Sequence, residues 1–210
     1  MPTKAKSTFD VNIQRASYFL DIHAGAQRGA GAPKLPLREL PRGAIVFAVG
    51  AIDAYLSEVS AEIIVRELQE NAAPPELREL LRRIQTEIPT LALEIALLAT
   101  QRERVNRIRE AVVEHFYNNI SNHGSKAVAR TVRRIGGKPA DLWSALGAAG
   151  YREARQKLDR WTDIRHRIVH QGKKPGVWRE HARGFIDLAR AVVSRVDQLA
   201  ADAMIHGHGK

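Results

Sequence analysis

Residues 44–52, Ala-Ile-Val-Phe-Ala-Val-Gly-Ala-Ile, decide the fold of this chain. The stretch is apolar on every side of the helix that it would form, and a helix of this kind belongs at the centre of a hydrophobic core. We therefore predict a long helix from about Pro41 to Glu70. Gly50 lies inside it and costs roughly 1 kcal/mol relative to alanine. Close approach of a neighbouring helix would explain why a glycine stands there.

Helical patterns continue on both sides of this stretch. Apolar residues recur at helical spacing, and segments with glycine or proline separate the patterns. We expect Ser125 to cap the helix that it begins and Gly172 to end the helix before it. No strand pattern and no repeat of fixed period stands out. The further predicted helices cover about residues 7–26, 76–84, 91–98, 101–117, 125–135, 141–146, 151–170 and 177–204.

Length and composition are those of one globular domain. The chain has 210 residues, of which 44% are hydrophobic and 6% aromatic, and this apolar content is enough for a packed core. We predict an all-α fold, a single helical-bundle domain with a long central buried helix and additional short helices. The domain spans residues 1–210, with its core at about 40–200 and with flexible tails at 1–6 and 205–210.

The chain is strongly basic, with a net charge of +10 and a pI of about 10.3. Such a balance favours a polyanionic partner, nucleic acid before an anionic membrane; the alternative is a basic surface without such a partner. The absence of cysteine excludes disulfides, thiolate catalysis and cysteine-based zinc sites. The N-terminus lacks the apolar segment of a signal peptide, and the longest apolar run is too short to span a bilayer. We expect a cytoplasmic protein that does not bind membranes.

The run Arg165-His-Arg-Ile-Val-His170-Gln-Gly172 holds the candidate catalytic pair. Histidine moves protons near neutral pH, and arginine binds phosphate through a rigid fork of donors. On an ideal helix, positions five apart are about 140° apart, so Arg165 and His170 should not touch as simple neighbours. They could converge if the helix ends at His170, or if two copies meet in a twofold dimer. The alternative is a histidine that caps its own helix and an arginine in a surface ion pair.

His166 and Asp53 are two further candidate residues of this site. His166 and His170 are four residues apart, which is a metal-ligand spacing, but the cation of Arg167 between them argues against a metal. We predict neither a metal nor a cofactor. Asp53 stands in the apolar helix, where a carboxylate is costly unless it is paired. Its partner could be Arg165 or another arginine, or the carboxylate could simply be exposed.

Basic residues gather in two places. No acidic residue occurs between Glu114 and Asp141, and this stretch holds cations at helical spacing that would suit phosphate contacts. A second group follows His170. The alternative is that these charges only solvate the surface. The predicted nucleic-acid contacts are Lys126, Arg130, Arg133, Arg134, Lys173 and Lys174.

These features together resemble the HEPN superfamily, in particular proteins of the RiboL-PSP kind. Arg165 to His170 looks like the Arg-x4-His motif of that family, and it stands, as there, late in an all-helical chain before a final helix. Residues 51–56, Ala-Ile-Asp-Ala-Tyr-Leu, are similar to the family's early helix. The resemblance covers roughly residues 40–199. His166 replaces a polar residue that is often asparagine, and Gly172 replaces the tyrosine of the nucleotidyltransferase-partnered toxin subtype.

The resemblance implies a metal-independent endoribonuclease that acts as a homodimer, often as a toxin or antiviral defence effector with a regulatory or antitoxin protein. Arg165 and His170 would be catalytic, and His166 and Asp53 would support them. Metal-free cleavage can use the 2′-hydroxyl of RNA as nucleophile, which leaves 2′,3′-cyclic phosphate and 5′-hydroxyl ends. The alternatives are a non-catalytic RNA-binding or scaffolding helical module, and a helical protein whose basic surface neutralises an acidic protein.

Overall fold

The computed structural model describes residues 2–26, 36–69, 75–119 and 124–206. These residues form nine helices and no strand, which confirms the all-α prediction. The loop predicted after the first helix and the end of the C-terminal tail, at 27–35 and 207–210, lie outside the described residues. The helices are α1 (Lys4–Ala26), α2 (Glu39–Gln69), α3 (Pro75–Glu87), α4 (Leu91–Leu97), α5 (Gln101–Asn119), α6 (Ser125–Arg134), α7 (Pro139–Ala148), α8 (Ala154–Gln171) and α9 (Arg179–His206).

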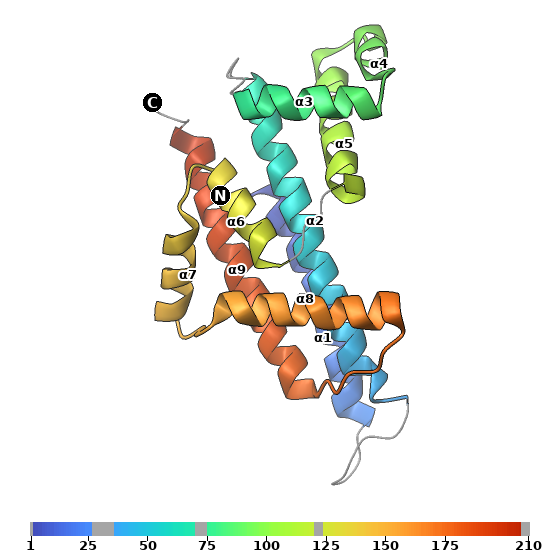
Figure 1. The fold of residues 1–210 in the computed structure, drawn as a ribbon, viewed down its shortest axis with the longest axis vertical. Coiled ribbons are helices and arrows are strands. Elements are labelled where there is room, and N and C mark those ends of the chain that lie inside the picture. The colour runs from blue at the N-terminus through green and yellow to red at the C-terminus, as the bar shows by residue number, and fades with distance from the viewer. Residues whose placement is uncertain (1, 27–35, 70–74, 120–123, 207–210) are drawn as a thin grey trace.

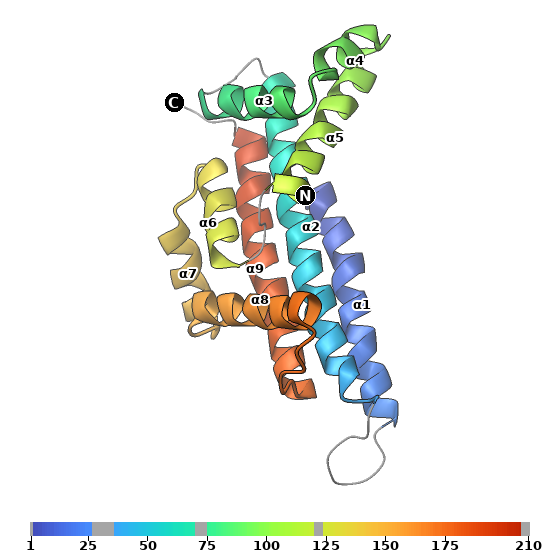
Figure 2. The ribbon, with the colours of Figure 1, turned by 45° about the vertical axis from the view of Figure 1, so that its right-hand side comes forward.

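Three long helices form the axis of the molecule. The helices α1, α2 and α9 lie side by side, with α1 antiparallel to the other two (Figures 1 and 2). The helix α8 crosses them, and α6 and α7 pack beside α9 near the start of α8. The helices α3, α4 and α5 gather at the far end of α2. This arrangement leaves both ends of α8 at the surface.

The predicted central helix is confirmed as α2. Ala44, Ile45, Ala48 and Ile52 are fully buried. By length and composition α2 could span a membrane, but 67% of its most apolar segment is buried inside the protein, as expected for the central helix of a bundle. The stretch is not covered on every side, because Phe47 is 44% exposed.

The described residues form two hydrophobic clusters that share α2. The larger cluster joins α1, α2 and α9 with α6, α7 and α8. The smaller cluster contains Ile64 at the end of α2 together with residues of α3, α4 and α5, among them Ile84 and Phe116. The continuous helix α2 connects the two clusters.

The first residues of the chain belong to the folded core. The backbone N and the Oγ1 of Thr3 both donate to the buried carboxylate of Asp197 on α9, and the hydroxyl of Tyr55 donates to it at 3.4 Å. Burial, and then the Asp197 carboxylate, raise the pKa of Tyr55 far above its ordinary value, so this hydroxyl stays a donor. The predicted flexible tail at 1–6 is therefore wrong from Thr3 onward. The predicted core, which began near residue 40, omitted α1.

Gly50→Ala should raise the free energy of unfolding by about 0.5–1 kcal/mol, because alanine restricts the unfolded chain and suits a helix interior. The prediction that a helix approaches Gly50 closely is wrong, since a Cβ there would meet nothing within 4 Å. The close approach occurs at Gly43, where a Cβ would lie 3.2 Å from the ring of Phe19. Urea denaturation of both alanine variants tests this difference. A Gly43→Ala variant as stable as Gly50→Ala would contradict it.

Candidate functional site

The end of α8 is built by one buried face and one glycine. Ala154, Leu158 and Ile164 bury their side chains and fix the helix against the core. Gly172 ends the helix with a φ of 60°, in the left-handed region that favours glycine. The predicted helix end is thus confirmed, and His170 lies in the last turn.

Arg165 and His170 are in direct contact. The Nη1 of Arg165 lies 3.1 Å from the Nε2 of His170. Of the two routes by which the pair could converge, the end of the helix suffices within one chain, because α8 stops one residue after His170 and the long arginine side chain reaches across the turn. Arginine can only donate a hydrogen bond, so Nε2 of His170 is the acceptor and carries no proton in this contact.

The surroundings of the pair leave it open to a ligand. The side chains of His166 and His170 are exposed, and their ring centroids lie 4.9 Å apart. Arg165 is half-buried, and its Nε is buried without a hydrogen-bond partner among the described residues. An unsatisfied buried donor costs about 1–3 kcal/mol, a cost that a water molecule or an ion can offset. The guanidinium therefore has donor capacity beyond its bond to His170.

Two exposed lysines follow the pair in the sequence. Lys173 and Lys174 come directly after Gly172, the residue that ends α8. Arg42 of α2 holds this connection in place, since its Nε donates to the carbonyl of Pro175 at 2.9 Å and its Nη2 donates to the carbonyl of Lys174 at 3.2 Å. Arg42 is itself paired with Glu39 at 2.6 Å. The loop that carries both lysines is thereby anchored to the start of α2.

Asp53 lies on α2, the helix against which α8 packs, and it is half-buried. Its backbone carbonyl accepts a hydrogen bond from Ser57 Oγ at 3.0 Å. The pairing of its carboxylate with Arg165 stays a prediction. In the described part of the chain, no group of three or more histidine, cysteine, aspartate or glutamate residues is placed to hold a metal ion.

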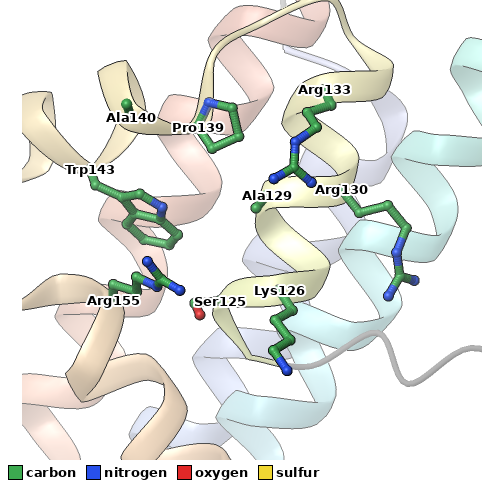
Figure 3. Close-up of a pocket in the computed structure, with 9 residues that line it drawn as sticks. All are labelled: Ser125, Lys126, Ala129, Arg130, Arg133, Pro139, Ala140, Trp143 and Arg155. Carbon is green, nitrogen blue, oxygen red and sulfur yellow. The ribbon is translucent and has the colours of Figure 1, made fainter.

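A basic pocket of about 480 Å³ lies between α6, α7 and the start of α8 (Figure 3). It brings together three of the predicted phosphate contacts. It also adds Arg155 and Trp143, which the sequence analysis missed because they come from other helices and carry no local signal. The pocket is lined by Ser125, Lys126, Ala129, Arg130, Arg133, Pro139, Ala140, Trp143 and Arg155.

Arg134 does not line this pocket. Its guanidinium carbon lies 5.2 Å from the centre of the Phe116 ring, in a cation–π contact. Burial lowers the pKa of Arg134, and the carboxylate of Glu67 counteracts this effect. Arg133 therefore lines the pocket, whereas its neighbour Arg134 packs against the smaller hydrophobic cluster.

The start of α6 is capped by α8. The predicted cap, Ser125, is instead the first helical residue. Asp159 on α8 accepts hydrogen bonds from the backbone N and from the Oγ of Ser125, both at 2.7 Å. The local sequence could not show this because the capping carboxylate lies 34 residues away. These two bonds fix α6, and with it the pocket, on α8.

The pocket and the Arg165–His170 pair lie at opposite ends of α8. Arg155 is in the first turn of α8 and His170 in the last. At 1.5 Å per residue, the two positions are about 22 Å apart along the helix axis. The described residues thus present two separate basic sites, one at each end of α8.

Comparisons of the chain with protein-family models, with curated proteins and with solved structures found no match. A fold alone does not define an activity. The function is therefore argued from the residues of the two sites.

Proposed function

We propose that the protein is a metal-independent endoribonuclease of HEPN type, which cleaves RNA to 2′,3′-cyclic phosphate and 5′-hydroxyl ends. The observation that carries the proposal is the 3.1 Å contact between Arg165 Nη1 and His170 Nε2 at the exposed end of α8. It places a proton acceptor beside a phosphate-binding fork, which is the combination that this reaction requires. The resemblance of residues 165–170 to the HEPN motif supports the same assignment.

The reaction needs two proton transfers and one site of charge stabilisation. His170 Nε2 takes the proton of the 2′-hydroxyl as the 2′-oxygen bonds to phosphorus. As RNA enters, Arg165 exchanges its bond to Nε2 for bonds to the phosphate, and it stabilises the charge of the phosphorane. The bond from phosphorus to the 5′-oxygen then breaks, and that oxygen takes a proton. We assign this proton to His166, whose ring centroid lies 4.9 Å from that of His170.

We place the active form in a homodimer whose subunits meet at this end of α8. The exposed position of His166 and His170 supports this, because a second subunit would exclude water from the reacting groups. Val169, between them, is also 46% exposed, which suits a contact surface. Light scattering at micromolar concentration should give the mass of a dimer. A monomer that cleaves RNA at full rate would contradict this arrangement.

In the cell, the proposal corresponds to a cytoplasmic toxin or antiviral defence effector with a regulatory or antitoxin protein. A second candidate function is a non-catalytic RNA-binding module. The observation that favours this second function is the basic pocket, since it could bind RNA without using Arg165 or His170. The two functions differ in whether bound RNA is cut.

Incubation of the purified protein with end-labelled RNA in excess EDTA tests the proposal. We expect cleavage at the same rate with and without EDTA, because no step uses a metal. Cleavage that EDTA abolishes would contradict the metal-free mechanism. RNA that binds and remains intact would support the non-catalytic module instead.

A further inference from the structure

We infer that the basic pocket at the start of α8 is a nucleotide subsite, which holds one nucleotide unit of an RNA strand with its base on Trp143 and its phosphates on Arg133 and Arg155. The choice of an RNA strand as ligand rests on the proposed function. The pocket itself does not depend on it, because none of its lining residues belongs to the Arg165–His170 pair.

The charge of the pocket selects an anion. Four of its nine lining residues are cations, Lys126, Arg130, Arg133 and Arg155, and none is acidic. None of the four forms an ion pair with a carboxylate in the part of the chain that the structure describes. Unneutralised like charges in one concave site attract anions strongly. The carboxylate of Asp159, which touches the pocket wall, is occupied by Ser125.

The shape of the pocket and its side chains favour a nucleotide over other anions. Arg133 of α6 and Arg155 of α8 reach into the pocket from two sides, and the indole of Trp143 lies close to Arg155 (Figure 3). Guanidinium forks match phosphate oxygens. Trp143 is half-buried, packed on the core at one side while lining the pocket at the other. An aromatic ring among cations is the combination that binds single-stranded nucleic acid.

The backbone of the site is held in place by helices before any ligand binds. Asp159 ties α6 to α8 through Ser125, and Arg155 lies one turn before Asp159 on the same helix. The backbones of Arg133 and Arg155 are therefore held at a fixed separation by helices rather than by loops. Preformed sites on regular elements lose little entropy on binding.

The position of the subsite has a consequence for cleavage. His170 is about 22 Å from Arg155 along the axis of α8, so a strand held in the pocket has to extend over several nucleotides to reach it. The subsite would then set the distance between the bound nucleotide and the bond that is cut. RNA too short to occupy both ends of α8 should be cut more slowly than longer RNA.

Binding of an uncleavable probe tests the phosphate contacts. The probe is fluorescent single-stranded 2′-O-methyl RNA of about 12 nucleotides, a typical site size for a single-strand binder, and it lacks the 2′-hydroxyl nucleophile. The Arg133→Ala/Arg155→Ala protein should bind it at least tenfold more weakly. The slope of log affinity against log salt concentration should fall in magnitude by about 1.4, which corresponds to two phosphate contacts on a single strand.

The matched control is the Arg15→Ala/Arg102→Ala protein, which loses the same charge from exposed positions on α1 and α5. We expect its affinity to change less than twofold. Wild-type affinity in the pocket variant would overturn the inference. An equal loss in the control would also overturn it, because binding would then follow net charge alone.

Fluorescence tests the base contact. The probe should quench tryptophan emission of the wild-type protein, and Trp143→Phe should remove most of this quenching while it keeps an aromatic ring in the core. Quenching that persists in the variant would come from Trp161 or Trp178 and would overturn the role of Trp143. A further outcome is that a nucleoside monophosphate displaces the probe from the wild-type protein but not from the Arg133→Ala/Arg155→Ala protein. That result would support the subsite, with a free nucleotide as its ligand.

The same proteins separate the two proposals. If wild-type protein leaves unmodified RNA intact but the pocket variant loses affinity for the probe, the ribonuclease proposal fails and the subsite stands. If RNA is cleaved in a His170-dependent way but the pocket variant binds the probe normally, the subsite fails and the ribonuclease proposal stands.

Discussion

Replacing His170 with alanine should lower the rate of RNA cleavage by about 10²- to 10⁴-fold, which is the usual contribution of a positioned acid or base. In the structure, His170 is exposed and contacts Arg165 and His166. Its removal should therefore leave the fold and the thermal unfolding temperature unchanged. Rates measured under single-turnover conditions report the chemical step directly.

The control for this variant is Gln171→Ala, which changes the next exposed residue at the same helix end. It should cleave RNA at nearly the wild-type rate. The affinity of His170→Ala for the 2′-O-methyl probe should stay within about twofold of wild type, since histidine acts on protons rather than on binding. A His170→Ala protein that cleaves at the wild-type rate would remove this residue from the chemistry.

Replacing Arg165 with alanine should lower the cleavage rate by about 10²- to 10³-fold, the effect expected when one preorganised donor to the developing charge is lost. The guanidinium is held half-buried beside His170, with a buried Nε that has no partner among the described residues. Arg165→Lys keeps the charge but not the fork, so it should recover only a small part of the rate.

Arg167→Ala is the matched control, because it removes the same charge from an exposed position two residues away. Its cleavage rate should fall less than threefold, a loss that mainly reflects weaker RNA attraction. An Arg167→Ala variant as inactive as Arg165→Ala would mean that the charge of this helix end matters and not the contact with His170. Full activity of Arg165→Lys would equally contradict the role given to the fork.

Much of the fold could be predicted from local patterns. The apolar residues at 44–52 locate α2, and Phe9, Ile13 and Leu20 recur at helical spacing and are buried in α1. Gly172 ends α8 as predicted because its effect is local, a single residue at positive φ. The predictions that were wrong concern contacts between distant parts of the chain. The N-terminal residues were predicted as a tail because nothing near Thr3 shows that Asp197 would bind it.

For the two candidate sites too, local sequence gave part of the answer and the packing of distant residues gave the rest. The sequence supplied Arg165 and His170, but helix angles alone argued against their contact, since they ignore the length of an arginine side chain and the end of α8. Arg133 and Arg134 could not be distinguished until the structure placed one in the pocket and the other on Phe116. Arg155 and Trp143 join the pocket only through the packing of three helices.

The two sites at the ends of α8 have different roles in the proposed enzyme. On this proposal, the pocket at the start of the helix would bind the strand through phosphate and base contacts, and the pair at its end would cut it. Because α8 carries Arg155 near its start and the pair near its end, the separation of these backbone positions cannot change without breaking helical hydrogen bonds. A ribonuclease built in this way would measure a fixed length of single strand between the bound nucleotide and the cut.

The chemical identity of the RNA ends formed in EDTA tests the central claim most directly, and mass spectrometry of the products measures it. The Arg165–His170 mechanism uses the 2′-hydroxyl as nucleophile, so the upstream product should end in a 2′,3′-cyclic phosphate and the downstream product should begin with a 5′-hydroxyl. A single 2′-deoxynucleotide before the cut bond should abolish cleavage there. Products with a 3′-hydroxyl and a 5′-phosphate would show that water attacks the phosphorus, and this result would contradict the mechanism.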